Sequence, residues 1–290
     1  MATLTKQQLF SSSMIAFMQE LKGGFLKKFC ETKTATGGES LTFNRLAEAT
    51  AKADLKSMFD STFGAGDGGD MKDFKAMITQ ISAQMKVKEV DMNKTSIDIK
   101  NGYVKSLGNA VMRKEDLEIL KAVRATADLV KAGLGAAGDT FATETVIKKL
   151  VSQIRKAQAL ADYTPDNHRG VALVMTPEDY ADMASSDVMI NADYANAFAG
   201  GVNGTPTTFF GAEIVLVKAN NTEMKAGEVF LIPSNTVAFA EWEGSTIGDA
   251  IWVPSDARTW HLQAIKSVGA IGIEGKSIAL LSSTSTEPTA

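Results

Sequence analysis

One apolar stripe constrains the fold more than any other feature of the sequence. Between residues 94 and 131, aliphatic side chains recur every three or four positions, which is the period of an amphipathic α-helix. Asp91 or Asn93 can cap its start, and at 1.5 Å per residue the helix is on the order of 50 Å long. The stripe consists of Val104, Leu107, Val111, Leu117, Leu120, Val123, Ala127 and Val130. The acidic residues fall on the other face: Glu115, Asp116 and Glu118.

The remaining periodic segments divide between helices and strands. Glycines at 133–138 end the long helix, and a second helix is predicted over residues 143–162. Residues 171–175 form a buried-strand pattern that leads into a helix with Thr176 as N-cap and Pro177 at N1. Later strands are predicted at 209–210, 214–217, 229–232, 237–242, 258–268 and 277–281. Helices mostly before residue 185 and strands mostly after residue 205 indicate an α+β fold.

The first 90 residues contain little core of their own. Residues 6–21 carry a short helical stripe, ended by Gly23-Gly24, that needs a partner on a neighbouring element or subunit. Thr36 to Phe43 is predicted to form one arm of a hairpin, the glycine-rich run from Phe63 to Asp70 a flexible tip, and residues 86–91 a short strand. Long segments of this kind are typical of interaction loops, which favours an oligomer.

Composition and charge exclude several classes of protein. The single cysteine, Cys30, cannot form an internal disulfide, and we expect a soluble protein of the cytosol. No window of about 18 apolar residues predicts a membrane span, and polar residues interrupt residues 9–21, so no signal peptide is predicted. The net charge of −4 argues against strong nucleic-acid binding. The longest basic cluster, Lys148-Lys149 with Arg155-Lys156, is interpreted as a solvated helix face.

Two glycine-rich runs resemble binding motifs only in part. Gly133 to Gly138 spells the dinucleotide fingerprint G-x-G-x-x-G, which works only after a strand, at the start of a helix, with an acidic residue about 20 positions on. Here the run is predicted to follow a helix, and the positions around 158 hold no acid until Asp162, so we interpret it as a linker. Gly64 to Asp70 resembles one calcium-binding nonapeptide, which needs tandem copies, and is interpreted as a loop.

No constellation of catalytic or metal-binding residues emerges. His168 and His261 are the only histidines, and neither has His, Cys or a carboxylate at metal-ligand spacing. A Ser–His–Asp triad stays open, because its members can lie far apart, but no G-x-S-x-G elbow is present. Cys30 lacks a signature and is interpreted as a small, partly buried hydrophobe. No catalytic, cofactor-binding or metal-binding residue is therefore assigned, no cofactor is expected, and the chain is predicted not to be an enzyme.

Carboxylate pairs and tryptophans are assigned structural roles. Glu241 and Glu243 share a strand face and could form a hydrolytic pair, but solvated strand edges give the same pattern. Asp98 with Glu115 and Asp116 forms another candidate pair without a motif. The tryptophans could line a sugar site, and we interpret them as covering a sheet, in the core or at an interface: Trp242, Trp252 and Trp260.

Three stretches in a fixed order share a pattern with one known family. The first comprises Ile97 to Tyr103, Leu107 to Ala110 and Asp116 to Leu120. The second runs from Val171 to Tyr180, with P-x-x-Y, and continues at Ile190 to Tyr194, with I-N-x-D-Y. The third combines Phe210 to Val215 with Val268 to Ile271. Over roughly residues 85–281 this pattern resembles the major capsid proteins of tailed bacteriophages, closest to the short-tailed phages, whose fold is shared with herpesvirus shells and encapsulins.

The resemblance implies an α+β tailed-phage capsid fold with a defined layout. Residues 1–36 would form an N-terminal arm, and residues 37–90 an extended loop that lies over a neighbouring subunit. A peripheral domain with the long spine helix and long strands would comprise residues 91–141 and 236–267. An axial domain with a central β-sheet would comprise residues 142–235 and 268–283, followed by a mobile tail at residues 284–290.

The resemblance also implies a structural function. Copies of the chain would form pentamers and hexamers of an icosahedral shell around packaged double-stranded DNA, without strong specific DNA binding. Scaffold, portal and decoration proteins are possible further partners, no membrane is involved, and the virion capsid would assemble in the host cytoplasm. Some relatives cross-link a lysine to an asparagine; Lys52 and Lys56 lie in the loop without a motif. The alternatives are an encapsulin-like compartment, a nucleotide-dependent oxidoreductase using Gly133 to Gly138, and a phage tail or adhesion protein.

Overall fold

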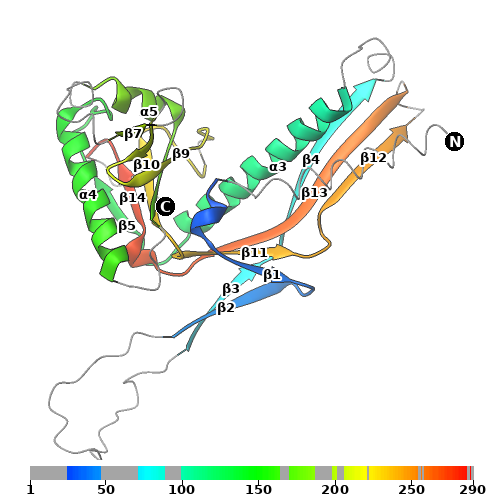
Figure 1. Cartoon of the computed structure of the whole chain (residues 1–290), viewed down its shortest axis with the longest axis horizontal. Coiled ribbons are helices and arrows are strands. Elements are labelled where there is room, and N and C mark those ends of the chain that lie inside the picture. Colours follow the sequence, from blue (N-terminus) through cyan, green and yellow to red (C-terminus); the bar gives the residue numbers. More distant parts are fainter. Residues whose placement is uncertain are drawn as a thin grey trace, which may run out of the picture.

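Two β-sheets, each with its own long helix, organise the chain (Figure 1). The computed structural model describes residues 25–46, 71–88, 99–163, 170–186, 198–200, 206–220, 222–253, 256, 258–285 and 288. Several predicted features lie outside these residues: the helix at 6–21, the glycine-rich tip at 63–70, Lys52, Lys56, Asp98, His168 and residues 190–194. The described part of the chain has no helix that is both long enough and apolar enough to cross a membrane.

The first lobe is a five-stranded sheet with the long helix α3 (Ile99–Arg124) packed on it. Its central strand is β13 (Thr259–Gly272), which pairs along one edge with β4 (Thr79–Lys88). The other edge of β13 pairs first with β12 and then with β11, and β1 adds parallel to β11. These three strands span Ile247–Val253, Val237–Trp242 and Glu31–Ala35. The apolar stripe of α3 enters the shared core as expected, with Val104, Leu107, Val111, Leu120 and Val123 buried.

The predicted length of the spine helix is wrong at its C-terminal end. α3 ends at Arg124 rather than 131, because Thr126 turns back on it through its N–H to the Val123 carbonyl and its hydroxyl to the Ala122 carbonyl. Asp128 then adopts a left-handed conformation with φ of 59°. Val130, expected on the helical stripe, begins strand β5 (Val130–Gly133), which pairs parallel with β14 (Ala279–Ser282).

The second lobe is a seven-stranded sheet with the order β5-β14-β10-β6-β9-β8-β7. Its inner strands β10 (Glu228–Pro233) and β6 (Val171–Met175) are buried at every position, as continuous apolar runs require. One face carries α4 (Glu144–Tyr163) and α5 (Pro177–Ala184), and the other faces the end of α3. The remaining strands, β7, β8 and β9, span Phe198–Gly200, Pro206–Phe209 and Ala212–Leu216.

A separate two-stranded hairpin packs beside β1 and β11 of the first lobe (Figure 1). It pairs β2 (Ser40–Leu46) with β3 (Met71–Met77) in antiparallel register, and residues 47–70 connect them. The expected hairpin arm at Thr36 to Phe43 is therefore only partly right: β2 takes β3 as its partner, whereas the preceding β1 joins the first lobe. The short strand expected at 86–91 begins seven residues earlier, at Thr79.

Three connections cross between the lobes, and they pack against one another. They lead from α3 to β5, from β10 to β11, and from β13 through η5 (Gly275–Ser277) to β14. A Cβ on Gly272 would lie 1.8 Å from Thr126 Oγ1, and one on Gly275 would lie 1.8 Å from the Ala127 carbonyl oxygen. Only glycine allows this approach, so the junction between the lobes depends on these two positions.

The strand-to-helix prediction at Thr176 is confirmed in detail. Thr176 is extended, its hydroxyl accepts the Asp179 N–H at 3.1 Å, and Pro177 opens α5. Every described α-helix lies before residue 185, as expected, but six strands lie there too, so the separation of helices from strands is weaker than predicted. β12 was not predicted, because its inward positions are occupied by Gly248, Ala250 and Trp252 and do not form an aliphatic run.

Candidate subunit-contact surfaces

The residues considered for catalysis or metal binding do not come together. Within the described ranges, no three His, Cys, Asp or Glu side chains cluster closely enough to hold a metal ion. His261 Nε2 lies 3.0 Å from Asp256 Oδ2, which also accepts a bond from Lys86 Nζ at 2.8 Å, on an exposed sheet face. Cys30 is more buried than expected: its thiol donates to the Leu26 carbonyl at 3.5 Å, and burial raises its pKa. A buried thiol of raised pKa is a poor nucleophile.

The glycine run at 133–138 has a packing role. It follows the strand β5 and not a helix, which corrects the prediction, but α4 begins only at Glu144. A Cβ on Gly133 would lie 2.6 Å from the Thr284 carbonyl oxygen, and one on Gly135 would lie 2.3 Å from that of Ser283. The C-terminal chain therefore occupies the space that a dinucleotide phosphate would need.

The basic cluster and the tryptophans also have structural roles. Lys148, Lys149, Arg155 and Lys156 are exposed on α4, as predicted. Lys148 Nζ bonds Glu144 at 2.5 Å, and the Arg155 guanidinium lies 5.6 Å from the Phe210 ring centre. Trp252 and Trp260 pack at 5.1 Å between ring centres, and Trp242 is buried below the hairpin. The sheet-covering interpretation of the tryptophans is confirmed.

The acidic face assigned to α3 is not solvated. Glu115 is 1 % exposed and Asp116 is 4 % exposed. Lys266 Nζ, on the inward face of β13, bonds Glu115 Oε1 at 2.6 Å and Glu241 Oε1 at 2.8 Å. Glu241 therefore lies in a buried ion-pair network, and the prediction that it marks a solvated strand edge is wrong. A lysine at an inward strand position is the sequence signal that could have revealed this network.

Charge explains the pKa shifts in the network. Burial would raise the pKa of Glu241, but hydrogen bonds and charge from Lys266 and Lys27 outweigh it and lower the pKa. Burial would lower the pKa of Lys266, and the Glu115 and Glu241 carboxylates raise it instead. Both groups are therefore charged at neutral pH, and the network acts as a fixed clamp between α3, β11 and β13.

The first described segment of the chain joins both lobes. Asp116 Oδ2 accepts the Phe25 N–H at 3.2 Å and Asp116 Oδ1 accepts the Leu26 N–H at 3.0 Å. In the short helix η1 (Lys27–Phe29), Lys27 Nζ bonds Glu241 at 2.5 Å in the first lobe, and Lys28 pairs with Glu213 of the second. Residues 25–30 are thus held on the helix α3 and on both sheets.

The hairpin is anchored at the junction between the lobes. Arg45 Nη1 donates to Glu274 Oε1 at 3.0 Å, and Arg45 Nη2 donates to the Asn235 carbonyl at 2.5 Å. These two acceptors belong to two different connections between the lobes. At the other end of the hairpin, the Trp242 indole N–H donates to the Gly38 carbonyl at 2.8 Å. Both ends of the described hairpin are therefore held on the body of the subunit, and its Phe43 and Ala76 are buried against the first lobe.

Large apolar side chains remain exposed at a few places. Met77 and Ile78 lie where the hairpin meets β4, Ile247 and Ile251 lie on the edge strand β12, Phe25 and Leu216 flank a pocket, and Val130 begins β5. Exposed apolar groups on sheet edges and loops are candidates for contact with other chains. Sequence patterns do not reveal them, because an exposed Met or Ile resembles a buried one until the sheet register is known.

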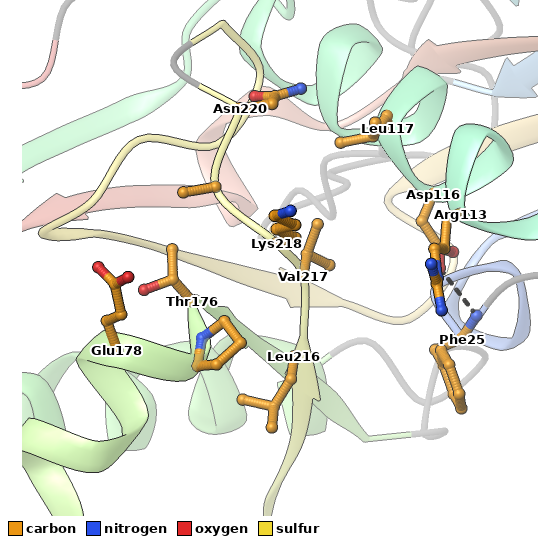
Figure 2. Close-up of a pocket in the computed structure, with 12 residues that line it drawn as sticks. Phe25, Arg113, Asp116, Leu117, Thr176, Glu178, Leu216, Val217, Lys218 and Asn220 are labelled. Carbon is orange, nitrogen blue, oxygen red and sulfur yellow. Dashed lines mark hydrogen bonds between the residues drawn. The ribbon is translucent and has the colours of Figure 1, made fainter. Parts of the chain in front are cut away.

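The pocket lies between the lobes and has a volume of about 740 Å³. Figure 2 shows Phe25 and Arg113 on one side, Thr176 and Glu178 on the other, and the end of β9 between them. Burial raises the pKa of Asp116, on its α3 wall, to about 6, although two backbone N–H donors partly oppose the shift.

Comparison with other proteins shows which family has this fold. A family model described as phage capsid protein matches residues 2–280. No curated protein sequence matches the chain. Among solved structures, the virus-like particle from Pyrococcus furiosus is similar at 12 % identity and a TM-score of 0.60, over 95 % of this chain and 99 % of that chain.

Two phage structures show the same similarity of fold. The capsid of the cyanophage P-SCSP1u matches at 12 % identity and a TM-score of 0.61, over 91 % of this chain and 89 % of that chain. The Mycobacterium phage Che8 structure matches at 16 % identity and a TM-score of 0.57, over 87 % of both chains. With the family model covering nearly the whole chain, this protein belongs to the phage capsid protein family and is a structural component of the virion shell, not an enzyme.

Proposed function

We propose that copies of this capsid protein form the pentamers and hexamers of an icosahedral shell around packaged double-stranded DNA. The observation that carries the proposal is the set of large apolar side chains that stay exposed where the hairpin meets β4 and on the edge strand β12: Met77, Ile78, Ile247 and Ile251. A neighbouring subunit can cover such surface on assembly.

We propose that the two lobes are the two domains expected of a capsid subunit. We assign the α3 lobe to the peripheral domain and the α4 lobe to the axial domain. β4 pairs along β13, so we end the extended loop at residue 78 and not at 90. Residues 130–133 pair with the second sheet and residues 268–272 with the first, so we move these segments to the axial and peripheral domains respectively.

Finer assignments remain part of the proposal. Membership of the short-tailed phages rests on the spine-helix pattern of residues 97–120. Scaffold, portal and decoration proteins are the expected further partners. Residues 1–36 are assigned to the N-terminal arm. The mobility of residues 284–290 stays a prediction. Two residues of this segment do not support it, because Thr284 bonds Ser282 and Pro288 is buried.

Electron microscopy of the purified full-length chain tests the proposal. We expect closed icosahedral shells, or rings of five and six subunits. A monomer or dimer that never assembles, even with a phage scaffold protein supplied, would contradict it. Met77→Glu tests the contact made by the hairpin: Met77 is 60 % exposed, so the variant should fold but not form shells. Gln80→Glu, exposed on the adjacent strand, is the control and should assemble normally.

A compartment shell is the second candidate, because the similar particle from Pyrococcus furiosus is described as virus-like. Shells isolated from the natural host separate the two functions. Nuclease-protected double-stranded DNA inside the particles supports the virion, and a co-purifying protein cargo without DNA supports the compartment.

A further inference from the structure

We propose that the pocket between the lobes is the docking site for residues 9–21 of the same chain. The pocket's wall includes apolar side chains from four separate segments: Phe25, Leu117, Pro177, Leu216, Val217 and Ala219. Two of the wall residues are large apolar residues that stay exposed: Phe25 is 67 % exposed and Leu216 is 42 % exposed. Apolar surface of this kind, recessed between two lobes, is what a helix with an apolar face covers.

The occupant is identified by where the described chain begins. Phe25 is held in the wall by the hydrogen bond from its N–H to Asp116 (Figure 2), so the segment that precedes it is attached to the chain at the pocket itself. Residues 1–24 lie outside the described ranges, and their sequence carries one amphipathic stripe. Its members are Leu9, Phe10, Met14, Phe17, Met18 and Leu21.

The length of the connection favours the pocket of the same subunit. Only Lys22, Gly23 and Gly24 separate the stripe from Phe25, so Leu21 is within about 14 Å of Phe25 whatever path the chain takes. The two glycines allow a reversal that other residues resist. A tether this short holds the stripe at an effective concentration in the millimolar range, far above that of a second copy in dilute solution.

Charge supports the same occupant. Arg113 and Lys218 stand at the pocket, and within the described ranges neither forms an ion pair. Glu20 is the only acidic residue among the first 24. At 100° per residue, Glu20 lies beside the stripe formed by Phe10, Met14, Phe17 and Leu21, where it can face these cations while the apolar side chains enter the pocket.

This inference goes beyond shell formation, because it concerns the unassembled subunit. The first test is limited chymotrypsin cleavage of the full-length, unassembled chain at Phe10 and Phe17. We expect Leu216→Glu to accelerate cleavage at both sites at least tenfold relative to the wild type, since a docked helix is cleaved only when it opens. The control is Ile251→Glu, equally exposed but on β12, which should stay within about twofold of the wild type. Equal cleavage rates in the wild type and Leu216→Glu would overturn the proposal.

The second test shows whether the docked segment belongs to the same chain or to another copy. It does not require that the Leu216→Glu variant folds. In a Cys30→Ala background, Leu216→Cys is combined in turn with Met14→Cys, Phe17→Cys and Met18→Cys, and mild oxidant is added. We expect at least one pair to form a disulfide within a single chain, whereas the same three paired with Ile251→Cys should not. Disulfides only between chains, or none with Leu216→Cys, would refute docking in the same subunit. Shell formation by the wild type is scored separately by microscopy, so the two proposals can fail independently.

Discussion

Asp116 should make the stability of the subunit depend on pH in an unusual direction. Its carboxylate is 4 % exposed, and burial raises the pKa from 3.8 to about 6. The folded state therefore binds a proton more tightly than the unfolded state does, so this residue's contribution to the free energy of unfolding grows as pH falls through 6 and is complete below 4. A difference of about two pKa units corresponds to roughly 3 kcal/mol.

Asp116→Asn isolates this contribution. The variant removes the titrating group, and its side-chain oxygen still accepts one of the two N–H bonds from residues 25 and 26. Urea denaturation of the unassembled subunit between pH 8 and pH 4 gives the free energy of unfolding of both proteins. We expect the free energy of unfolding of the wild type to rise by about 2–3 kcal/mol relative to that of the variant as pH falls from 7 to 4.

A second aspartate is the control, because its shift has the opposite sign. Asp256 is exposed beside Lys86 and His261, whose hydrogen bonds lower its pKa to about 2. The wild type should therefore lose stability relative to Asp256→Asn as pH falls below 4. If the difference between the wild type and Asp116→Asn is independent of pH, or shrinks toward pH 4, then Asp116 is not a buried carboxylate held by the N-terminal segment.

Two further predictions concern packing and capping. Gly275→Ala should destabilise the subunit by about 1–3 kcal/mol or more in thermal denaturation, because its Cβ would lie 1.8 Å from the Ala127 carbonyl oxygen. Gly102→Ala, in α3 with nothing within 4 Å of the added Cβ, should stabilise it by about 0.5–1 kcal/mol; equal effects would contradict the close packing between the lobes. Thr176→Val should cost about 1–2 kcal/mol, through loss of the cap to Asp179 and of the hydroxyl bond to its carboxylate at 2.7 Å. Thr145→Val, exposed on α4, should change stability by less than about 0.5 kcal/mol, and a similar loss in both threonine variants would reject the cap.

The sequence was sufficient wherever local rules decide the structure. The Thr176-Pro177 cap, the run of residues 171–175 and the stripe of α3 each combine a short-range signal with a matching burial pattern, and all three are present. Boundaries failed where a distant partner decides. Val130 fits a helical stripe by spacing, but pairing with Ala279, far along the chain, makes it a strand residue.

Local sequence patterns could not predict the surfaces proposed for assembly either, because these surfaces also depend on distant partners. Arg45 reaches Asn235 and Glu274 across 190 and 229 positions of sequence, and Asp116 holds Leu26 across 90. No spacing rule relates residues so far apart, since their proximity follows from the arrangement of two sheets and three connections. Because the hairpin and the N-terminal segment are both bonded to these connections or to the helix between them, neither can shift far in a shell without breaking bonds that hold the lobes together. The described parts of both segments are therefore fixed to the body of the subunit.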